Sequence, residues 1–371
     1  MLNTGRLTRA EINLSAIAHN TAAFKSLLGP QTALCAVVKA DGYGHGAVAA
    51  ARVALAAGAD SLAVSSLDEG LALRAAGFIG DILILGHTPN AQAHLVAENN
   101  LTATVFRMNQ AEALAGAAES LGRTAKVHLK VDSGMARLGV TPAEAADLAA
   151  QVSRQPRLQL EGIFTHFAQA DEADKSRTRE QFAAFQHALE AVASRGIAIP
   201  VKHCANTAAT LDMPETHLDM ARVGLGLYGL WPSTETSRPI GLRPAMQFKT
   251  AVSMLKRVPA NTPLSYGGTH VTSAETVIAT LPVGYADGFP RCLSGRAEVL
   301  INGRRAPIVG RVCMDQCLAD VTHLPAISEG DEALLFGGPE LPAEEAAAWQ
   351  GTINYEVVCQ VGKRVPRVYL G

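Results

Sequence analysis

Eight short apolar runs alternate with segments of helical composition over about the first 230 residues, and this alternation is the strongest constraint on the fold. Each run is short enough to be a strand that is buried on both faces. Strands that alternate with helices predict a parallel sheet, and eight such units predict a (β/α)8 barrel of the TIM type. A doubly wound sheet is the alternative, but it would not need eight successive units. The predicted strands are 34–39, 61–65, 81–85, 102–106, 127–131, 160–166, 201–204 and 220–225.

Helix start signals lie between these predicted strands. Ser66 and Glu69 have the spacing of a capping box, and so do Thr141 and Glu144. In such a box the first side chain caps the helix and the glutamate reaches back to the main chain. The longest predicted helix spans 177–194 and carries an apolar stripe on one face.

The alternation ends at a segment rich in Pro, Ser and Thr, residues 231–239, which is typical of a linker. At 371 residues the chain exceeds the size at which a single core usually stops growing. We therefore predict an α/β barrel domain over 1–240 and a mainly β domain over 241–371; a weakly alternating first strand at 7–14 could belong to either. The β domain is predicted to hold strands at 250–258, 275–281, 297–302, 307–314, 331–336 and 353–358, with one helix at 342–349.

Composition narrows the function classes. A net charge of -2 gives no electrostatic basis for binding nucleic acid or an anionic membrane, so small-molecule chemistry is favoured. The first residues lack an apolar signal core, and no apolar run approaches the roughly 18 residues of a membrane span, so we expect a cytoplasmic protein. The six cysteines include no CxxC pair, which favours free thiols over a disulfide framework or a metal site.

One lysine stands out at the end of the first predicted barrel strand. Lys39 is followed by three glycines, which permit positive φ, and then by a predicted helix over 47–55. Burial at a strand end, beside Tyr43 and His45, can lower the pKa of the amine and make it nucleophilic. This pattern suggests a lysine that forms a Schiff base. A solvated strand end is the commoner reading of a lone lysine.

Other polar residues follow later barrel strands, where TIM-type barrels gather their chemistry. An arginine after a strand can bind a carboxylate through two oxygens, although a surface arginine is the commoner case. Glycine-rich late loops frequently bind phosphate through backbone N–H groups, but they can equally be close-packed turns. The strand-end residues are Asp132, Arg137, His166, His203, Asn206, Thr207 and Arg222.

Seven motifs resemble those of alanine racemases, in the same order and over nearly the whole chain. The departures are small: Gly42 replaces a common alanine, Ser133 a common threonine and Gly268 a common arginine. The motifs are VVKADGYGHG at 37–46, HLKVDSGMARLG at 128–139, MARVGLGLYG at 220–229, SYGGT at 265–269, VGYADG at 283–288, GRVCMDQ at 310–316 and INYEV at 353–357.

The resemblance implies that Lys39 carries pyridoxal 5'-phosphate (PLP) covalently. It also implies two catalytic bases, Lys39 and the Tyr266 of a partner subunit, with His166 and Arg137 supporting the tyrosine. Lys130 matches a lysine that can be carbamylated. The implied cofactor-binding residues are Lys39, Tyr43, His166, Asn206, Thr207, Arg222, Gly224, Leu225 and Tyr355, and the implied substrate-binding residues are Arg137, Tyr285, Met314 and Asp315.

The implied function is interconversion of L-alanine and D-alanine in a homodimer with shared active sites, either supplying D-alanine for peptidoglycan or degrading it. Three alternatives stay open: a racemase of broader specificity, a basic amino-acid decarboxylase, which shares the barrel and β domain, and a non-catalytic PLP-binding protein. The settings of Tyr266 and Arg222 speak against a decarboxylase. The added β domain speaks against a cofactor carrier.

Overall fold

The computed structural model describes residues 5–371, which divide into two compact units. The barrel unit comprises Ile17–Gly42 and Ala47–Arg243. The β unit comprises the residues through Ala16, together with Tyr43–Gly46 and Pro244–Gly371. Among the helices of residues 5–371, none combines the length and the apolar character that crossing a membrane requires.

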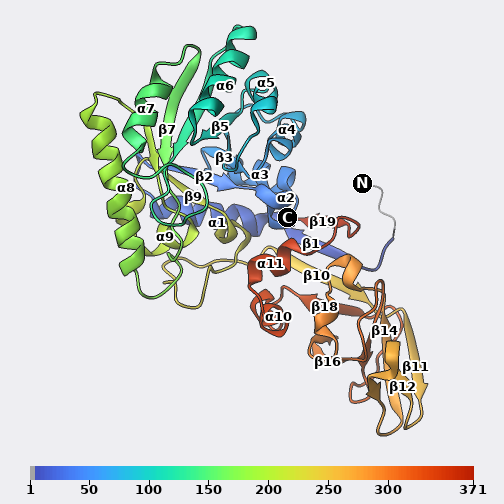
Figure 1. The fold of residues 1–371 in the computed structure, drawn as a ribbon. Helices are drawn as coiled ribbons and strands as arrows, with labels where there is room; N and C mark the ends of the chain where they lie inside the picture. The colour runs from blue at the N-terminus through green and yellow to red at the C-terminus, as the bar shows by residue number, and fades with distance from the viewer. Residues whose placement is uncertain (1–4) are drawn as a thin grey trace. The chain divides into compact units, whose positions relative to one another are not determined.

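Parallel strands form the centre of the barrel unit, and its helices lie outside them (Figure 1). The eight strands follow the order β8-β7-β6-β5-β4-β3-β2-β9. Backbone hydrogen bonds from Asp219 N to Lys202 O (3.1 Å) and from Arg222 N to Ala205 O (3.0 Å) join β8 to β9. The barrel is therefore nearly closed, which confirms the predicted fold class. The strands are β2 (Ala33–Val37), β3 (Ser61–Val64), β4 (Ile82–Ile84), β5 (Thr102–Val105), β6 (Ala125–Lys130), β7 (Leu158–Phe164), β8 (Val201–His203) and β9 (Met220–Val223).

The barrel strands form because their side chains are buried on both faces. Every residue of β4, β5 and β9 is buried, as expected for strands covered by helices on the outside and by packed side chains on the inside. The helices are amphipathic, and α8 buries Phe182, Phe185 and Val192 on one face. The helices are α1 (Leu14–Leu27), α2 (Lys39–Tyr43), α3 (Ala47–Ala56), α4 (Leu67–Ala75), α5 (Ala93–Glu98), α6 (Met108–Ser120), α7 (Ala145–Ser153), α8 (Ser176–Ser194) and α9 (Thr207–Asp212), with short 3-10 turns η1 (Asn90–Gln92), η2 (Pro214–Thr216) and η3 (Leu225–Tyr228).

A nine-stranded sheet forms the β unit, in the order β11-β14-β17-β16-β15-β18-β10-β1-β19. The first described strand, β1, pairs antiparallel with β10 and parallel with β19, the last strand, so the first and last strands of the described residues lie side by side in this sheet. The strands are β1 (Arg9–Asn13), β10 (Met246–Ala251), β11 (Met254–Val258), β14 (Thr276–Leu281), β15 (Glu298–Ile301), β16 (Arg304–Val309), β17 (Cys317–Asp320), β18 (Glu332–Phe336) and β19 (Arg367–Leu370), with a separate hairpin of β12 (Pro263–Leu264) and β13 (His270–Val271).

Helices and turns complete the β unit, and one of them corrects a predicted strand. Residues 353–358 form the helix α11 (Asn354–Cys359), because their buried side chains, Asn354, Val357 and Val358, follow helical spacing. Asn354 Nδ2 also donates to Glu344 Oε1 (2.8 Å) on the neighbouring helix α10 (Ala343–Gln350). The remaining turns are η4 (Tyr266–Gly268), η5 (Tyr285–Asp287) and η6 (Arg291–Leu293).

Two other predicted strands are shorter than expected. The run 250–258 divides into β10 and β11 at Val252 and Ser253. The run 307–314 ends as a strand at Val309, because Gly310 has φ +67° and turns the chain away.

Candidate active site

The turn after β2 is left-handed. Ala40, Asp41, Gly42 and Tyr43 have φ between +52° and +62°, so the positive φ that was predicted for glycines extends to three residues with side chains. A left-handed helical turn costs roughly 1–2 kcal/mol for each such residue. Hydrogen bonds from Gly42 N to Val38 O (2.9 Å) and from Ala47 N to Asp41 Oδ1 (2.9 Å) help to hold it. The main chain at Lys39, which is partly exposed, is therefore bent sharply away from the strand.

Glu69 also binds this turn. Its Oε1 accepts from Ala40 N (2.7 Å), and its Oε2 accepts from Ser65 N (2.7 Å). The predicted capping box with Ser66 is wrong in this respect, because Ser66 makes no side-chain cap. The glutamate binds the ends of two strands instead.

Arg222, on β9, is the centre of a buried hydrogen-bond network. Its Nη1 donates to His203 Nδ1 (2.8 Å), and its Nη2 donates to Thr165 O (2.9 Å), Cys204 O (3.1 Å) and His166 Nδ1 (3.1 Å). All of these acceptors are neutral, and no carboxylate among residues 5–371 forms an ion pair with this guanidinium. Burial lowers the pKa of Arg222 to about 10, which still leaves it protonated at neutral pH.

The network continues through two histidines to a carboxylate. Because arginine can only donate, His203 Nδ1 is the acceptor, and the proton of the neutral ring is on Nε2. His203 Nε2 then donates to His128 Nδ1 (2.8 Å), and His128 Nε2 donates to Glu161 Oε2 (3.4 Å). In this series of hydrogen bonds, each donor lies on the Arg222 side and each acceptor on the Glu161 side. This direction fixes the tautomers of the two imidazoles, His203 and His128.

The pKa shifts agree with neutral imidazoles. Burial lowers the pKa of His128 and outweighs the attraction of Glu161, while burial and then Arg222 lower the pKa of His166 and His203. The hydrogen bond from His128, followed by Lys126 at 2.7 Å, lowers the pKa of Glu161 to about 2. The histidines are therefore uncharged at neutral pH, and Glu161 is ionised.

Lys130 is the second unusual lysine of the barrel. Its side chain is buried, with Nζ donating to Val131 O (3.1 Å) and lying 4.9 Å from the centre of the Phe164 ring. Burial, and then the charge of Arg222, lowers its pKa well below the usual lysine value. Arg137, by contrast, is exposed in the loop that follows the same strand.

Two predicted phosphate-binding loops lie against each other. Gly224 N donates to Thr207 Oγ1 (3.0 Å), and Asn206 caps α9 by accepting from Ala209 N (3.0 Å). Leu225 is buried at the start of the turn η3. The structure thus brings Asn206, Thr207, Gly224 and Leu225 together at the ends of β8 and β9.

The candidate residues of the β unit lie on its surface. Tyr266 is 70% exposed, Met314 52% and Tyr285 43%. Asp315 pairs with Arg364 (2.7 Å), which also binds the buried carboxylate of Asp287.

Another pair of predicted cofactor residues meets within the β unit. The rings of Tyr43 and Tyr355 lie 6.3 Å apart, centre to centre. Tyr43 is buried, whereas Tyr355 is partly exposed.

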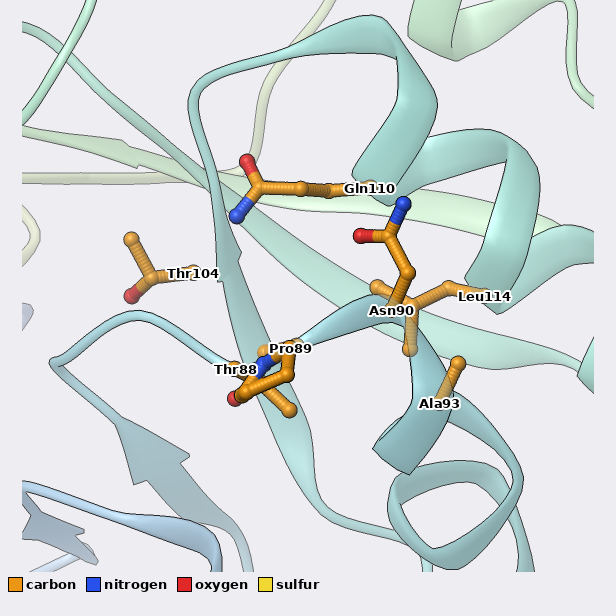
Figure 2. Close-up of a pocket in the computed structure, with 8 residues that line it drawn as sticks. Thr88, Pro89, Asn90, Ala93, Thr104, Gln110 and Leu114 are labelled. Atoms are coloured by element: carbon orange, nitrogen blue, oxygen red, sulfur yellow. The ribbon is translucent and has the colours of Figure 1, made fainter.

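A small cavity beside β5 does not serve as a substrate site. Thr88, Asn90, Thr104, Gln110 and Leu114 are among the residues that line it (Figure 2). Its volume of about 10 Å³ accommodates roughly one water molecule. The hydroxyl of Thr88 is buried without a protein partner, which a water molecule in this cavity would satisfy.

Sequence reasoning missed two members of the Arg222 network and the role of Glu69. His128 and Glu161 fall inside predicted strands, and their contacts with residues of neighbouring strands form only when these strands are side by side in the barrel. The alternation of His128 with Leu129 and Lys130 was the available signal, because successive strand residues face opposite sides.

The fold and the site together define a two-unit barrel enzyme with a lysine-bearing turn and a buried arginine at the strand ends. The family described as "Alanine racemase, N-terminal domain" matches residues 12–232, and "Alanine racemase, C-terminal domain" matches residues 245–369. The chain belongs to the alanine racemase family.

Named relatives align with nearly the whole chain. An alanine racemase of Desulfovibrio desulfuricans is 55% identical and covers 100% of both chains, and one of Desulforamulus reducens is 52% identical over 98% of both. The solved structure of an alanine racemase from Clostridium difficile has a TM-score of 0.97 at 40% identity, covering 100% of this chain and 97% of that one. An alanine racemase from Bacillus anthracis with bound L-Ala-P has a TM-score of 0.93 at 38% identity, covering 99% and 95%.

Proposed function

We propose that this chain is a PLP-dependent racemase that interconverts L-alanine and D-alanine by a two-base mechanism. Family membership supports the activity, and the relatives match over the full length of both chains. The observation that carries the proposal is the buried guanidinium of Arg222, because all of its hydrogen-bond partners are neutral.

The residues at the strand ends fit PLP. A buried cation without a carboxylate partner favours an additional acceptor, which the pyridine nitrogen of the cofactor would supply. Asn206, Thr207, Gly224, Leu225 and Tyr355 are the residues proposed to hold the phosphate end, Lys39 would carry the cofactor, and Tyr43 is proposed as a further cofactor-binding residue. When bound, PLP supplies the electron sink that makes the Cα hydrogen of an amino acid acidic.

Arg222 limits how far that electron sink acts. A guanidinium does not give up its proton at neutral pH, whereas an aspartic acid could protonate the ring nitrogen. Negative charge at Cα would therefore be short-lived, which favours return of a proton over loss of a larger group. This argues for racemisation and against decarboxylation.

Two bases on opposite faces of Cα complete the reaction. We assign Lys39 Nζ to one face and Tyr266 Oη, from the partner subunit, to the other. Tyrosine has a reference pKa of about 10 and needs assistance to act as a base. His166 is the proposed helper, since its Nδ1 accepts from Arg222 and its proton is therefore on Nε2.

Substrate alanine would be held by residues of two subunits. Arg137 of one subunit would bind its carboxylate through two N–H groups, and Tyr285, Met314 and Asp315 contributed by the other copy would shape the pocket around the methyl group. A pocket of this kind discriminates against one extra methylene by only about 1–3 kcal/mol, so slow turnover of other small amino acids is expected.

Lys130 fits carbamylation. The neutral amine, which is the form that attacks CO2, is favoured by the burial that lowers its pKa. The lone pair of the amine forms the new N–C bond while one C=O π bond of CO2 opens onto oxygen, the nitrogen then releases one proton to water, and the product is an anionic carbamate. The positive charges of Arg222 and Arg137, which act on this amine, would stabilise that anion.

Assembly and location follow from the same proposal. The exposed Tyr266, Tyr285 and Met314 fit a homodimer in which each copy completes the site of the other. We propose a cytoplasmic enzyme that either provides D-alanine for peptidoglycan or degrades it.

A chiral assay of the PLP-loaded protein tests this function. L-alanine and D-alanine should each decay to the same racemic mixture, and L-serine, L-lysine and L-ornithine should react much more slowly. Lys39→Ala should abolish both directions and the visible absorbance of the lysine-bound cofactor. Unchanged alanine with PLP bound, or CO2 released from lysine or ornithine, would refute the proposal in favour of a carrier or a decarboxylase.

A further inference from the structure

We propose that Glu69 is a positioning residue for Lys39. This inference rests on the proposed function, in which Lys39 carries the cofactor and moves a proton. Glu69 does not need to touch substrate or cofactor for this role, because it acts through the main chain on the C-terminal side of the lysine.

The geometry places one carboxylate across the ends of two adjacent barrel strands. Glu69 Oε1 accepts from Ala40 N and Oε2 accepts from Ser65 N, both at 2.7 Å. Ala40 follows Lys39 directly, so the first bond fixes the peptide plane that leaves the lysine. Ser65 follows β3, whose Ala63 O accepts from Val38 N (2.9 Å). The main chain around Lys39 is thus held to β3 on one side and to Glu69 on the other.

The turn after Lys39 needs these hydrogen bonds because its backbone conformation is unfavourable. Ala40 and Asp41 both have φ +53°, a region that L-residues disfavour. If the turn relaxed toward an ordinary right-handed form, the Ala40 N–H would turn away and the origin of the Lys39 side chain would shift. A shift of about 1 Å at a reacting group can reduce a rate by about a hundredfold.

The charge of Glu69 is suited to this place. It lies in the first turn of α4, which directly follows β3 (Figure 1), and the N-terminal end of a helix favours a negative charge. Glutamine has the same length but only one acceptor oxygen, so it could keep one of the two bonds and would turn its NH2 group toward the other N–H.

The opposite end of β2 offers a matched control. Asp60 Oδ2 accepts from Leu34 N (2.7 Å) and pairs with Lys25 (2.7 Å). Asp60→Ala therefore removes a carboxylate that holds the same strand, at the end away from Lys39. It should loosen the Leu34 amide without affecting the lysine.

The test compares Glu69→Gln, Glu69→Ala and Asp60→Ala in three measurements. Hydrogen exchange of cofactor-free protein reports the Ala40 and Ser65 amides. The appearance of visible absorbance after adding PLP reports attachment at Lys39, and mass spectrometry of the borohydride-reduced protein identifies the modified lysine. Steady-state kinetics with L-alanine separates kcat from KM.

For Glu69→Ala we expect exchange of both amides to rise roughly ten- to a hundredfold, as loss of a charged hydrogen bond implies. PLP attachment and kcat should fall by a similar factor, with KM little changed. Glu69→Gln should fall between this variant and the parent protein. Asp60→Ala should raise exchange at Leu34 only and keep parental attachment and kcat.

Faster Ala40 exchange with parental attachment and kcat would overturn the inference, and so would an equal loss of attachment in Asp60→Ala. If Glu69→Ala does not fold, Glu69→Gln carries the same comparison, since it retains one bond. PLP found on a lysine other than Lys39 in the parent protein would instead refute the proposed function, which separates the two failures.

Discussion

The two units differ in how deeply they bury their candidate functional residues. In the barrel unit, Arg222 is 3% exposed, and it binds four neutral acceptors around it. In the β unit, Tyr266 is 70% exposed at the start of the short turn η4. One set of residues is part of a core, and the other lies outside any core of its own unit.

In the barrel unit the candidate functional residues should also stabilise the fold, whereas in the β unit they should not. A buried polar network leaves unsatisfied donors or acceptors when one member is removed, so its residues contribute to stability as well as to chemistry. An exposed tyrosine contributes little to the stability of its own unit. Mutations should therefore reveal two kinds of candidate functional residue, one that also stabilises its unit and one that does not.

The largest expected effect is at Tyr266, where substitution should reduce activity without reducing stability. Tyr266→Ala should reduce proton abstraction in one direction of the reaction by roughly 10²- to 10⁴-fold, because the proposed general base on one face of Cα is lost. Its free energy of unfolding should change by no more than about 0.5 kcal/mol, since the side chain is exposed. Isotope exchange at Cα, started separately from L-alanine and D-alanine, together with denaturant unfolding, measures both quantities.

Val271→Ala is a suitable control, because this exposed side chain lies in the same hairpin region of the β unit and has no proposed role. It should retain parental exchange in both directions. Equal rates for Tyr266→Ala and the parent protein in both directions would remove the tyrosine from the mechanism.

A smaller effect is expected at Arg222, a candidate functional residue whose substitution should also reduce stability. Arg222→Ala leaves His203 Nδ1, Thr165 O and Cys204 O without their donor, and we expect the free energy of unfolding to fall by about 2–4 kcal/mol. Arg137→Ala, which removes an exposed arginine from the same unit, should stay within about 0.5 kcal/mol of the parent protein. Denaturant unfolding at a single protein concentration measures both variants. Similar stabilities for the two variants would show that the Arg222 network does not stabilise the barrel.

The sequence predicted the barrel well because each strand carries its own signal. Runs such as 82–84 and 102–105 are buried on both faces, so an apolar stretch between helical segments is enough to locate them. Residues 353–358 misled the prediction because Ile, Tyr and Val favour strands by composition. The buried Asn354 is hydrogen-bonded to Glu344, ten residues earlier, and this contact favours the helix. A contact between two elements cannot be recognised from a local sequence pattern.

The site was predicted in part for a similar reason. The motifs proposed Lys39 and Arg222 as candidates, the strand-end pattern proposed Thr207, and the structure shows Thr207 bonded to Gly224 across two loops. His128 and Glu161 were missed because their roles depend on barrel closure, which brings β6, β7 and β8 into register. The positive φ of Ala40 was missed because alanine, unlike glycine, gives no signal in sequence for such a conformation.

The smallest expected effect tests whether the barrel network is neutral, as its tautomers require. The pKa of His128, His166 and His203 is lowered in the folded protein, so below the unfolded value of about 6.5 the unfolded chain binds more protons. Stability is therefore full above about pH 6.5 and falls as the pH drops toward the lowered values. Each such histidine contributes a slope of up to about 1.4 kcal/mol per pH unit.

His128→Gln should remove one of these contributions. Whatever its stability at pH 7.5, its further loss between pH 6.5 and 5.5 should be smaller than that of the parent protein by up to about 1.4 kcal/mol, because one fewer buried imidazole must be kept uncharged. His94→Gln, which replaces an exposed histidine on α5, should keep the parental slope. Denaturant unfolding at the three pH values gives the comparison. An unchanged slope in His128→Gln would mean that His128 binds protons equally in the folded and the unfolded protein, which would contradict a neutral His128 in the folded network below pH 6.5.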